Sequence, residues 1–508
     1  MSTENLAPQA LIQLHAVDNV AVARVTLAQD TVVPQPDGSA LHVRNPVAAG
    51  HKIALRPIAR GEVVLKYGQP IGVACTAIAA GEHVHAHNLE MGQALPTQAG
   101  GGPAAAMLAP EAPASFEGYV RADGRVGTRN YIGVVSTVNC SASVCKGIAR
   151  AFEGGAALPG IDGVVAITHG SGCGMSDGEG LELLRRTLRG YASHPNFAAV
   201  LVVGLGCEVN QVVALLDGMP AAARVSSLTI QQQGGTREAI ASGQAVVREL
   251  AAEAAQARRT TVPASQLVVG LQCGGSDGYS GISANPALGA AVDLLVRYGG
   301  TAILSETPEI YGAEHLLTAR AARPEVAERL LARLQWWEGY ASRNGAELNN
   351  NPSPGNKAGG ITTILEKSLG AVAKGGSSPL NDVLDYAQPV RARGLVFMDT
   401  PGYDPVSATG QVAGGATLIC FTTGRGSTYG CKPTPSLKLA TNTPLFERMR
   451  MDMDFNAGGI VDGTQSVAEA GKLLFELMLE TASGRPTLSE THDLGDNEFV
   501  PWQLGAVM

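Results

Sequence analysis

Four cysteines come shortly after predicted strands, mostly in glycine-rich loops: Cys140, Cys173, Cys207 and Cys273. Ligands of a parallel sheet bind beyond the carboxyl ends of its strands, so a cysteine that recurs at this position is a candidate ligand. Thiolates bind soft metals and iron–sulfur clusters. We therefore predict a shared thiolate site, with Cys173, Cys207 and Cys273 as metal ligands. The alternative is four unrelated small residues in tight loops.

Histidines alternate with other residues at positions 83, 85 and 87. Side chains two residues apart share one face of a strand, and neutral imidazoles bind divalent metals. We predict His83 and His87 as metal ligands and expect this segment to contribute to an active site. The alternative is a solvated strand face that is rich in histidine.

A third group of loops carries cations and amides without apolar surface. Guanidinium forks suit carboxylates, so this lining predicts a small, hydroxylated anion as ligand. The predicted substrate ligands are Arg121, Arg129, Asn356, Lys357 and Arg425. For the arginines, the alternative is exposure on a turn.

Two nucleotide-binding motifs are absent from the sequence. A serine-hydrolase motif is present, but the residues after it do not fit the structure that this motif requires. A dinucleotide fingerprint would need glycine where Met175 stands, and no P-loop pattern occurs. Gly274-x-Ser276-x-Gly278 matches the nucleophile elbow of serine hydrolases, with Asp399 or Asp404 and His492 following in the required order. An elbow runs directly into a helix, however, and here residues 279–281 and Pro286 intervene. A serine hydrolase therefore stays as an alternative only.

Composition narrows the class of protein. The chain has 508 residues, 45% of them hydrophobic and 16% charged, which predicts large buried cores. A net charge of −8 argues against a nucleic-acid partner, and the apolar runs are too short for a membrane span. Eight cysteines without a Cys-x-x-Cys pair exclude a disulfide scaffold, a zinc ribbon and a thioredoxin-type motif. We expect a cytoplasmic enzyme or binding protein.

The secondary-structure elements that must position these residues follow two different sequence patterns, one before and one after about residue 115. Residues 1–95 show short strands between glycine turns, typical of a small all-β clip, and 96–115 is rich in Gly, Pro and Ala, as a linker would be. From 116 onward, apolar strands alternate with helices, which predicts an α/β fold with mostly parallel sheets and flanking helices. We place two α/β domains at 116–262 and 263–508.

Continuous Val/Ile/Leu runs predict strands that are buried on both faces. The predicted strands are 132–138, 163–168, 199–204, 226–230, 267–271, 301–304, 395–399 and 418–422. Helical periodicity predicts helices at 180–193, 236–258, 324–345 and 465–483.

Along almost its whole length, the sequence resembles the altronate/galactarate dehydratase family. The motifs that carry the resemblance are Gly118–Arg121, Arg129–Tyr131, His169–Gly174, Cys273–Asp277, Leu304–Glu309, Asn351–Lys357, Asp399–Asp404, Gly430–Pro433 and Asn497–Trp502. The first part, with Ala49–Lys52 and Gly81–His85, is similar to the SAF module that the family fuses in front.

The resemblance implies iron-dependent loss of water from C2 and C3 of a sugar acid, which gives a 2-keto-3-deoxy acid. A Lewis-acid metal would stabilise the developing dianion and assist the departing hydroxyl. The implied cofactor is Fe²⁺, with Mn²⁺ or an iron–sulfur cluster as alternatives. One group must take the C2 proton and another must protonate the hydroxyl. Our candidates are His169 or Lys432 as the base and His85 as the acid.

Within this family the predicted substrate is altronate, with galactarate as the next alternative. A lyase that splits sulfolactate is a further alternative, although its SAF part is usually a separate chain. A non-catalytic sugar-acid binding protein is the alternative outside enzymes. We further expect a homodimer.

Overall fold

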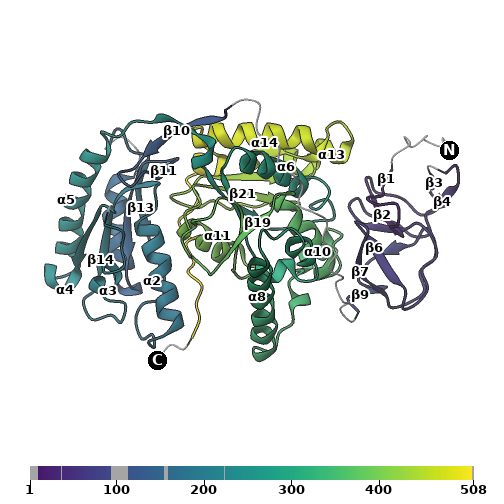
Figure 1. The fold of residues 1–508 in the computed structure, drawn as a ribbon, viewed down its shortest axis with the longest axis horizontal. Helices are drawn as coiled ribbons and strands as arrows, with labels where there is room; N and C mark the ends of the chain where they lie inside the picture. Colours follow the sequence, from purple (N-terminus) through teal and green to yellow (C-terminus); the bar gives the residue numbers. More distant parts are fainter. Residues whose placement is uncertain (1–9, 36, 93–112, 154–157, 222, 506–508) are drawn as a thin grey trace.

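The computed structural model describes residues 10–505 except 36, 93–112, 154–157 and 222. Most of the predicted linker at 96–115 therefore lies outside the described residues. Figure 1 shows three parts side by side: a small β module at one end, a four-stranded sheet at the other, and a seven-stranded sheet between them.

The module, residues 10–92, consists of short antiparallel strands in three small sheets, ordered β1-β2-β5-β8, β3-β4 and β6-β7-β9. Its apolar residues, such as Val64 and Ile71, belong to the same buried cluster as Leu271 and Val372 of the seven-stranded part. The module therefore shares a core with the body of the protein. Its strands are β1 (Leu11–Ile12), β2 (Val20–Ala23), β3 (Val32–Pro34), β4 (Ala40–His42), β5 (Lys52–Ala54), β6 (Val63–Lys66), β7 (Gln69–Ala74), β8 (His83–Val84) and β9 (Leu89–Glu90).

The part in the middle of the sequence (residues 131–254), which lies at one end of the molecule and is called the middle part below, is a four-stranded parallel sheet in the order β13-β12-β14-β15, covered by helices. Its strands are β12 (Tyr131–Ser136), β13 (Gly163–Ile167), β14 (Phe197–Gly204) and β15 (Val225–Thr229). Its helices are α1 (Asn139–Ala149), α2 (Glu179–Ala192), α3 (Val212–Leu216), α4 (Ile230–Gln233) and α5 (Thr236–Ala254), with the 3₁₀ turn η1 (Arg150–Phe152).

A small antiparallel sheet marks where the chain enters and leaves the middle part. β10 (Ser115–Val120) pairs with β11 (Val126–Gly127) on one side and with β16 (Thr260–Pro263) on the other. The stretch at 260–263, which we expected to be a boundary between domains, is therefore itself a strand.

The C-terminal part is a seven-stranded, entirely parallel sheet in the order β19-β20-β18-β17-β21-β22-β23. Its central strands are buried along their whole length, as apolar runs between two layers of helices must be. The strands are β17 (Val268–Cys273), β18 (Thr301–Leu304), β19 (Leu380–Leu384), β20 (Gly394–Met398), β21 (Leu418–Thr423), β22 (Ser436–Ala440) and β23 (Phe455–Asn456).

The helices of this part cover both faces of the sheet. On one face α14 packs against α6 (Figure 1), and on the other α11 packs against α2 of the middle part within one apolar cluster. The helices are α6 (Ala284–Arg297), α7 (His315–Thr318), α8 (Pro324–Arg343), α9 (Pro354–Ala358), α10 (Ile364–Val372), α11 (Asp404–Ala413), α12 (Thr443–Arg448), α13 (Gly458–Asp462), α14 (Val467–Ala482) and α15 (Leu488–Thr491). The 3₁₀ turns are η2 (Ala264–Gln266), η3 (Thr307–Ile310), η4 (Leu348–Asn350) and η5 (Ala373–Gly375).

The predicted fold class is confirmed: the structure is α/β with mostly parallel sheets and a small strand-rich module in front. Each predicted strand and helix exists within a few residues of its predicted bounds. The sequence analysis did not predict the helices α1, α6, α10 and α11 or the strands β19, β22 and β23. Because α1 begins at Asn139, Cys140 lies in the first turn of this helix rather than in a loop.

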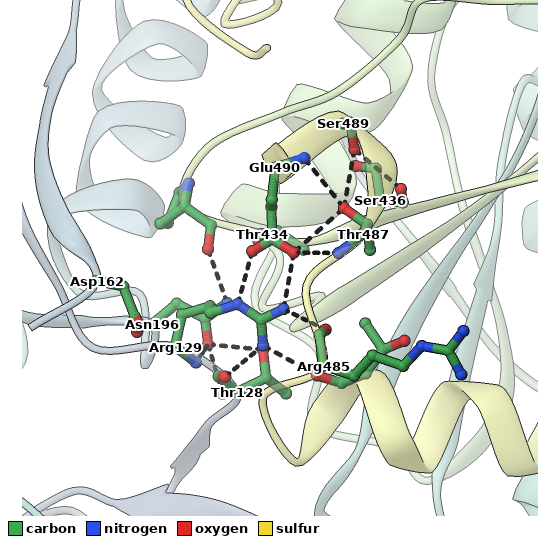
Figure 2. A network of polar contacts seen from close by, with 12 residues as sticks. Thr128, Arg129, Asp162, Asn196, Thr434, Ser436, Arg485, Thr487, Ser489 and Glu490 are labelled. Atoms are coloured by element: carbon green, nitrogen blue, oxygen red, sulfur yellow. Dashed lines mark hydrogen bonds and ion pairs between the residues drawn. The ribbon is translucent and has the colours of Figure 1, made fainter. Parts of the chain in front are cut away.

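A buried arginine ties the middle part to the C-terminal helices (Figure 2). Arg129 forms a bidentate ion pair with Glu490, at 2.6 Å from Nε and 2.8 Å from Nη2. Its remaining N–H groups donate to the backbone carbonyls of Thr128, Thr481 and Arg485. All five donors are used, so these contacts give Arg129 a structural role. They do not support its predicted role as a substrate ligand.

We predict that Arg129→Lys destabilises the protein by about 1–3 kcal/mol, because an ammonium group leaves several buried acceptors without donors. Thermal unfolding measures the loss. The kcat/KM of the folded fraction should stay close to that of the parent. The matched control is Arg125→Lys in the exposed pair with Asp123, which should cost less than about 1 kcal/mol. Equal losses in both variants would contradict this assignment.

Candidate functional site

Three buried side chains from neighbouring strands meet at the carboxyl edge of the seven-stranded sheet. Cys273 is the last residue of β17, and Glu306 and Glu309 follow β18. The Sγ of Cys273 lies 3.8 Å from Oε2 of Glu306 and 3.5 Å from Oε2 of Glu309. β18 lies on one side of β17, and β21, which comes much later in the chain, lies on the other. This is the topological switch point at which open α/β sheets bind ligands.

Two lysines complete this group, which we call the Cys273 centre (Cys273, Glu306, Glu309, Lys367 and Lys374). The Nζ of Lys374 lies 3.0 Å from both Cys273 Sγ and Glu306 Oε2. Lys367, in α10, donates to Oε1 of Glu309 at 2.8 Å. Both ion pairs are buried. The centre is therefore a compact set of charges held away from bulk water.

Burial sets the protonation of the centre. Burial raises the pKa of Glu306, and the carboxylate of Glu309 raises it further. Burial also acts to raise the pKa of Glu309, but Lys367 and Lys374 outweigh it and hold that pKa below its usual value. The centre thus pairs a proton-holding carboxyl group with an ionised one, which is the arrangement that acid–base catalysis uses.

A third carboxyl group borders the centre. Asp404 is the first residue of α11. Its carboxylate lies so close to Gly274 that a Cβ atom at position 274 would collide with it. Burial raises the pKa of Asp404 to about 6, and Glu309 contributes to the rise. Asp404 therefore titrates closer to neutral pH than an ordinary aspartate.

Glu306 has an unusual conformation and an unmet hydrogen bond. Its φ is +72°, in the left-handed region that non-glycine residues rarely adopt. Its Oε1 is buried without a hydrogen-bond partner among the described residues. Such a conformation costs about 1–3 kcal/mol and tends to occur at functional sites. The strained residue thus directs an unsatisfied acceptor into the centre.

The donor atoms of this centre fit a divalent metal ion. One ligand atom each from Cys273, Glu306 and Glu309 lie within 4.8 Å of one another. Carboxylates and a thiolate are acceptable ligands for iron or manganese. The unmet Oε1 of Glu306 is a further acceptor in the same place. Sequence spacing pointed to Cys273 but not to the two glutamates, although both lie within the Leu304–Glu309 motif.

The β module is anchored beside the centre by a buried three-membered ion network. Glu366, in α10, accepts from Lys52 at 2.8 Å and from Lys66 at 2.9 Å. Burial would raise the pKa of Glu366, but the two lysines outweigh it and lower that pKa strongly. A small cavity with room for about one water is lined by both Lys66 of the module and Cys273 of the centre. The module is thus a wall of the site.

Four histidines of the module gather at its contact with α9: His51, His83, His85 and His87, with ring centroids 5.1–5.5 Å apart. Nε2 of His85 lies 2.8 Å from the carbonyl of Lys357, and Nε2 of His51 lies 3.2 Å from that of Ala358. A carbonyl only accepts, so both Nε2 atoms carry the proton. His51 Nδ1 then accepts from His83 Nε2 at 2.9 Å.

This chain of hydrogen bonds leaves the lone pairs of His83 and His85 on their Nδ1 atoms. Burial and, to a smaller extent, the neighbouring histidines together lower the pKa of His83 to about 3. Burial also lowers the pKa of His85. Both rings are therefore neutral at pH 7, so they suit metal binding or proton acceptance. A neutral His85 with a lowered pKa fits the role of a base better than its predicted role as an acid.

The other predicted cysteines lie on the middle part. Cys140, Cys173 and Cys207 are all exposed and follow β12, β13 and β14, at one edge of the four-stranded sheet. Their loops touch: the N–H of Asn139 donates to Ser171, and that of Asn210 donates to Gly172. Cys273 belongs to the other sheet. The four cysteines therefore form two groups, not the single shared site that we predicted.

The comparisons with known proteins agree with the three parts of the fold. Residues 9–92 match the altronate/galactarate dehydratase SAF domain, residues 118–255 match the D-galactarate dehydratase/altronate hydrolase second domain, and residues 264–507 match the D-galactarate/altronate dehydratase C-terminal domain. The chain is 39% identical to an altronate dehydratase of Escherichia coli, over 95% of this chain and 97% of that protein. It belongs to the altronate/galactarate dehydratase family.

Two further relatives define the breadth of this family. A galactarate dehydratase (L-threo-forming) of Escherichia coli is 38% identical over 93% of both chains. A (2R)-sulfolactate sulfo-lyase subunit beta of Chromohalobacter salexigens is 34% identical over 77% of this chain and 97% of that protein. The family resemblance inferred from the sequence motifs is thus confirmed. Among the described residues, every helix is too short or too polar to span a bilayer.

Two residues predicted to transfer protons lie away from the Cys273 centre. His169, on the middle part, accepts from the N–H of Ser171 with Nδ1 and donates to the carbonyl of Ser136 with Nε2, so both nitrogens are engaged. Lys432 pairs with Asp493 and Asp496, which keep its pKa raised despite burial. A raised pKa makes Lys432 a cation rather than a base at pH 7.

The predicted substrate ligands are dispersed. Arg121 donates to Pro195, Asn130 and Arg129, which is a structural set of contacts. Asn356 is buried, accepts from the N–H of Ser353 in the capping box of α9 and donates to the carbonyl of Ser276. Lys357 and Arg425 remain at the carboxyl edge of the seven-stranded sheet: Lys357 contacts His85 through its carbonyl, and Arg425 is exposed beside Gly275. The role of Lys357 and Arg425 as substrate ligands stays a prediction.

The groups of a serine-hydrolase triad do not meet. Ser276 is buried, Asp399 accepts from Thr307 and Trp337, and His492 contacts the carbonyl of Met451. Gly278, the last residue of the elbow-like motif, lets the backbone of Gly50 approach, because a Cβ there would collide with its carbonyl oxygen. Gly278 therefore serves the docking of the module, whereas Gly274 leaves room for Asp404.

We predict that Glu366→Gln destabilises the protein by about 3–5 kcal/mol, because it leaves two buried ammonium groups without a carboxylate. Lys66→Met should cost less, since one lysine and one carboxylate remain paired. Thermal unfolding gives the order of the two losses. The control is Glu62→Gln in the exposed pair with Arg56, expected below about 1 kcal/mol. If Lys66→Met is the worse variant, the charge argument fails.

Proposed function

We propose that this protein is a hydro-lyase that removes water from C2 and C3 of altronate to give a 2-keto-3-deoxy acid. The match of all three parts to one dehydratase family, over nearly the full length of an altronate dehydratase, carries the proposal. Galactarate is the second candidate, since a galactarate dehydratase matches almost as well. The sulfolactate lyase is less favoured, because its beta subunit aligns with only 77% of this chain.

The Cys273 centre supplies what the reaction needs. A protonated Glu306, whose pKa burial raises, can donate to the departing hydroxyl. The ammonium groups of Lys367 and Lys374 offer preorganised positive charge to the dianion that forms as the C2 proton leaves. The neutral Nδ1 of His85 is our candidate to take that proton, and Lys357 and Arg425 are the candidates to hold the substrate carboxylate.

We also propose that the cofactor is Fe²⁺ or Mn²⁺ and that Cys273 and Glu309 hold it, while Glu306 keeps its proton for the acid step. His83 and His87 lie outside that group of ligand atoms and remain candidate ligands for a metal ion at the histidine cluster. Bound by Cys273 and Glu309, the ion would supply Lewis acidity for the carboxylate and the departing hydroxyl. The alternative cofactor is an iron–sulfur cluster on Cys140, Cys173 and Cys207, whose adjacent loops and exposed thiols favour it.

The decisive experiment assays altronate, galactarate and sulfolactate with the enzyme loaded with ferrous iron under reducing conditions. We expect a 2-keto-3-deoxy acid from altronate with the highest kcat/KM. Sulfite release from sulfolactate, or no keto-acid product from either sugar acid, would overturn the proposal.

We predict that Glu306→Gln lowers kcat by about 10²–10⁴-fold, the usual contribution of general acid–base catalysis. Glu328→Gln, on the exposed face of α8, is the matched control and should leave kcat unchanged. Full turnover by Glu306→Gln would remove this residue from the mechanism.

We predict that Cys273→Ser lowers the bound iron per chain and that chelation abolishes turnover. Iron content, measured on anaerobically purified protein, tests the site separately from activity. If Cys173→Ser and Cys207→Ser lose iron while Cys273→Ser keeps it, the cluster alternative replaces the mononuclear site.

A further inference from the structure

We propose that a cavity between the middle and C-terminal parts binds a small organic anion that carries two or more negative charges. The cavity measures about 570 Å³, within the range of about 300–1,000 Å³ that small-molecule sites occupy. It lies where two parts of the chain meet, a common position for such sites. The proposed dehydration does not use it.

The lining of the cavity combines both parts of the chain. One wall is α2 of the middle part, and the facing wall is the segment 389–393, which leads into β20. The floor consists of the amino ends of β17 and β18 and the end of α11. Five arginines line it: Arg125, Arg186, Arg189, Arg391 and Arg393.

Arg125 is paired with Asp123, but three of the five arginines have no carboxylate against them in the part of the chain that the structure describes. Arg189 donates to the carbonyls of Ala214 and Leu215, and Arg393 donates to those of Ser265 and Gly299. A carbonyl satisfies a guanidinium N–H but does not cancel its charge. Among the described residues, Arg391 has no ion-pair partner.

Arg186 adds a second kind of evidence. Its nearest carboxylate, that of Asp385, lies 3.9 Å away. Its Nε is buried and has no hydrogen-bond partner among the described residues. The Arg186 side chain as a whole is 35% exposed, so the accessible part of its guanidinium can form charge-assisted hydrogen bonds with a carboxylate or phosphate oxygen in the cavity. Two glutamates also line the cavity, Glu179 and Glu182, and Glu182 is paired with Arg185.

The cavity is separate from the Cys273 centre. Val268, at the start of β17, lines the cavity, whereas Cys273 ends that strand at the opposite edge of the sheet. Six residues of strand put the two places about 17 Å apart. An anion held between Arg186 and Arg391 would link the two parts of the chain and stabilise their contact.

Isothermal titration of the full-length protein with citrate and, separately, with pyrophosphate tests the proposal. We expect saturable one-to-one binding of at least one probe, weaker at high salt, together with a rise in Tm. Citrate alone would indicate a carboxylate ligand, and pyrophosphate alone would indicate a phosphate ligand. Arg186→Gln and Arg391→Gln should each weaken binding by roughly tenfold or more, the value of a charge-assisted hydrogen bond.

Arg425→Gln is the matched control, because it removes an exposed arginine at the opposite edge of the same sheet. It should leave the affinity unchanged. Loss of binding in Arg425→Gln alone would assign the anion to the catalytic edge, and equal weakening in all three variants would indicate general charge attraction. Either result, or no saturable binding, overturns the proposal. None of these measurements depends on turnover, so they stand apart from the test of the dehydratase.

Discussion

One buried carboxylate holds the site together. Glu366 accepts from two lysines of the β module in a place that water does not reach. Because an unpaired buried charge is costly, the three groups fix the module in one position on the C-terminal part. That position brings four histidines to α9 and makes Lys66 a neighbour of Cys273. Side chains from two regions that are far apart in the sequence become one site through this contact.

The two edges of the seven-stranded sheet carry different groups of side chains. At the carboxyl edge, the end of β17, the segment after β18, α10 and η5 bring a thiol, acids and lysines into a buried centre. At the amino edge, arginines surround a wide cavity that is open to solvent. β17 and β18 reach both edges, so the sheet is a rigid spacer between two sites of opposite character. The strain at Glu306 belongs to the dry edge, where surrounding packing can hold an unfavourable backbone conformation.

The sequence alone predicted the strands well, because runs such as Leu395–Phe397 are apolar enough to be buried on both faces whatever surrounds them. It also found Cys273 and the histidines of 83–87, whose spacing is local. It did not find Lys374, Lys367 or Glu366, since single charged residues in a helix look the same whether they face solvent or a buried partner. Arg129 was misassigned for the same reason: its partner Glu490 lies 361 residues away. Side chains that depend on distant contacts are decided by the tertiary fold.

The distance in sequence between the β module and Glu366 determines how long the module exists on the ribosome before Glu366 is added. Lys52 and Glu366 are 314 residues apart. At a translation rate of about 5–20 residues per second, the module is complete on the order of 15–60 s before its counter-charge exists. During that interval its two lysines must stay hydrated and its docking face uncovered. The nascent chain therefore passes through a stage in which the sequence of the module is complete but the surface on which it docks has not yet been made.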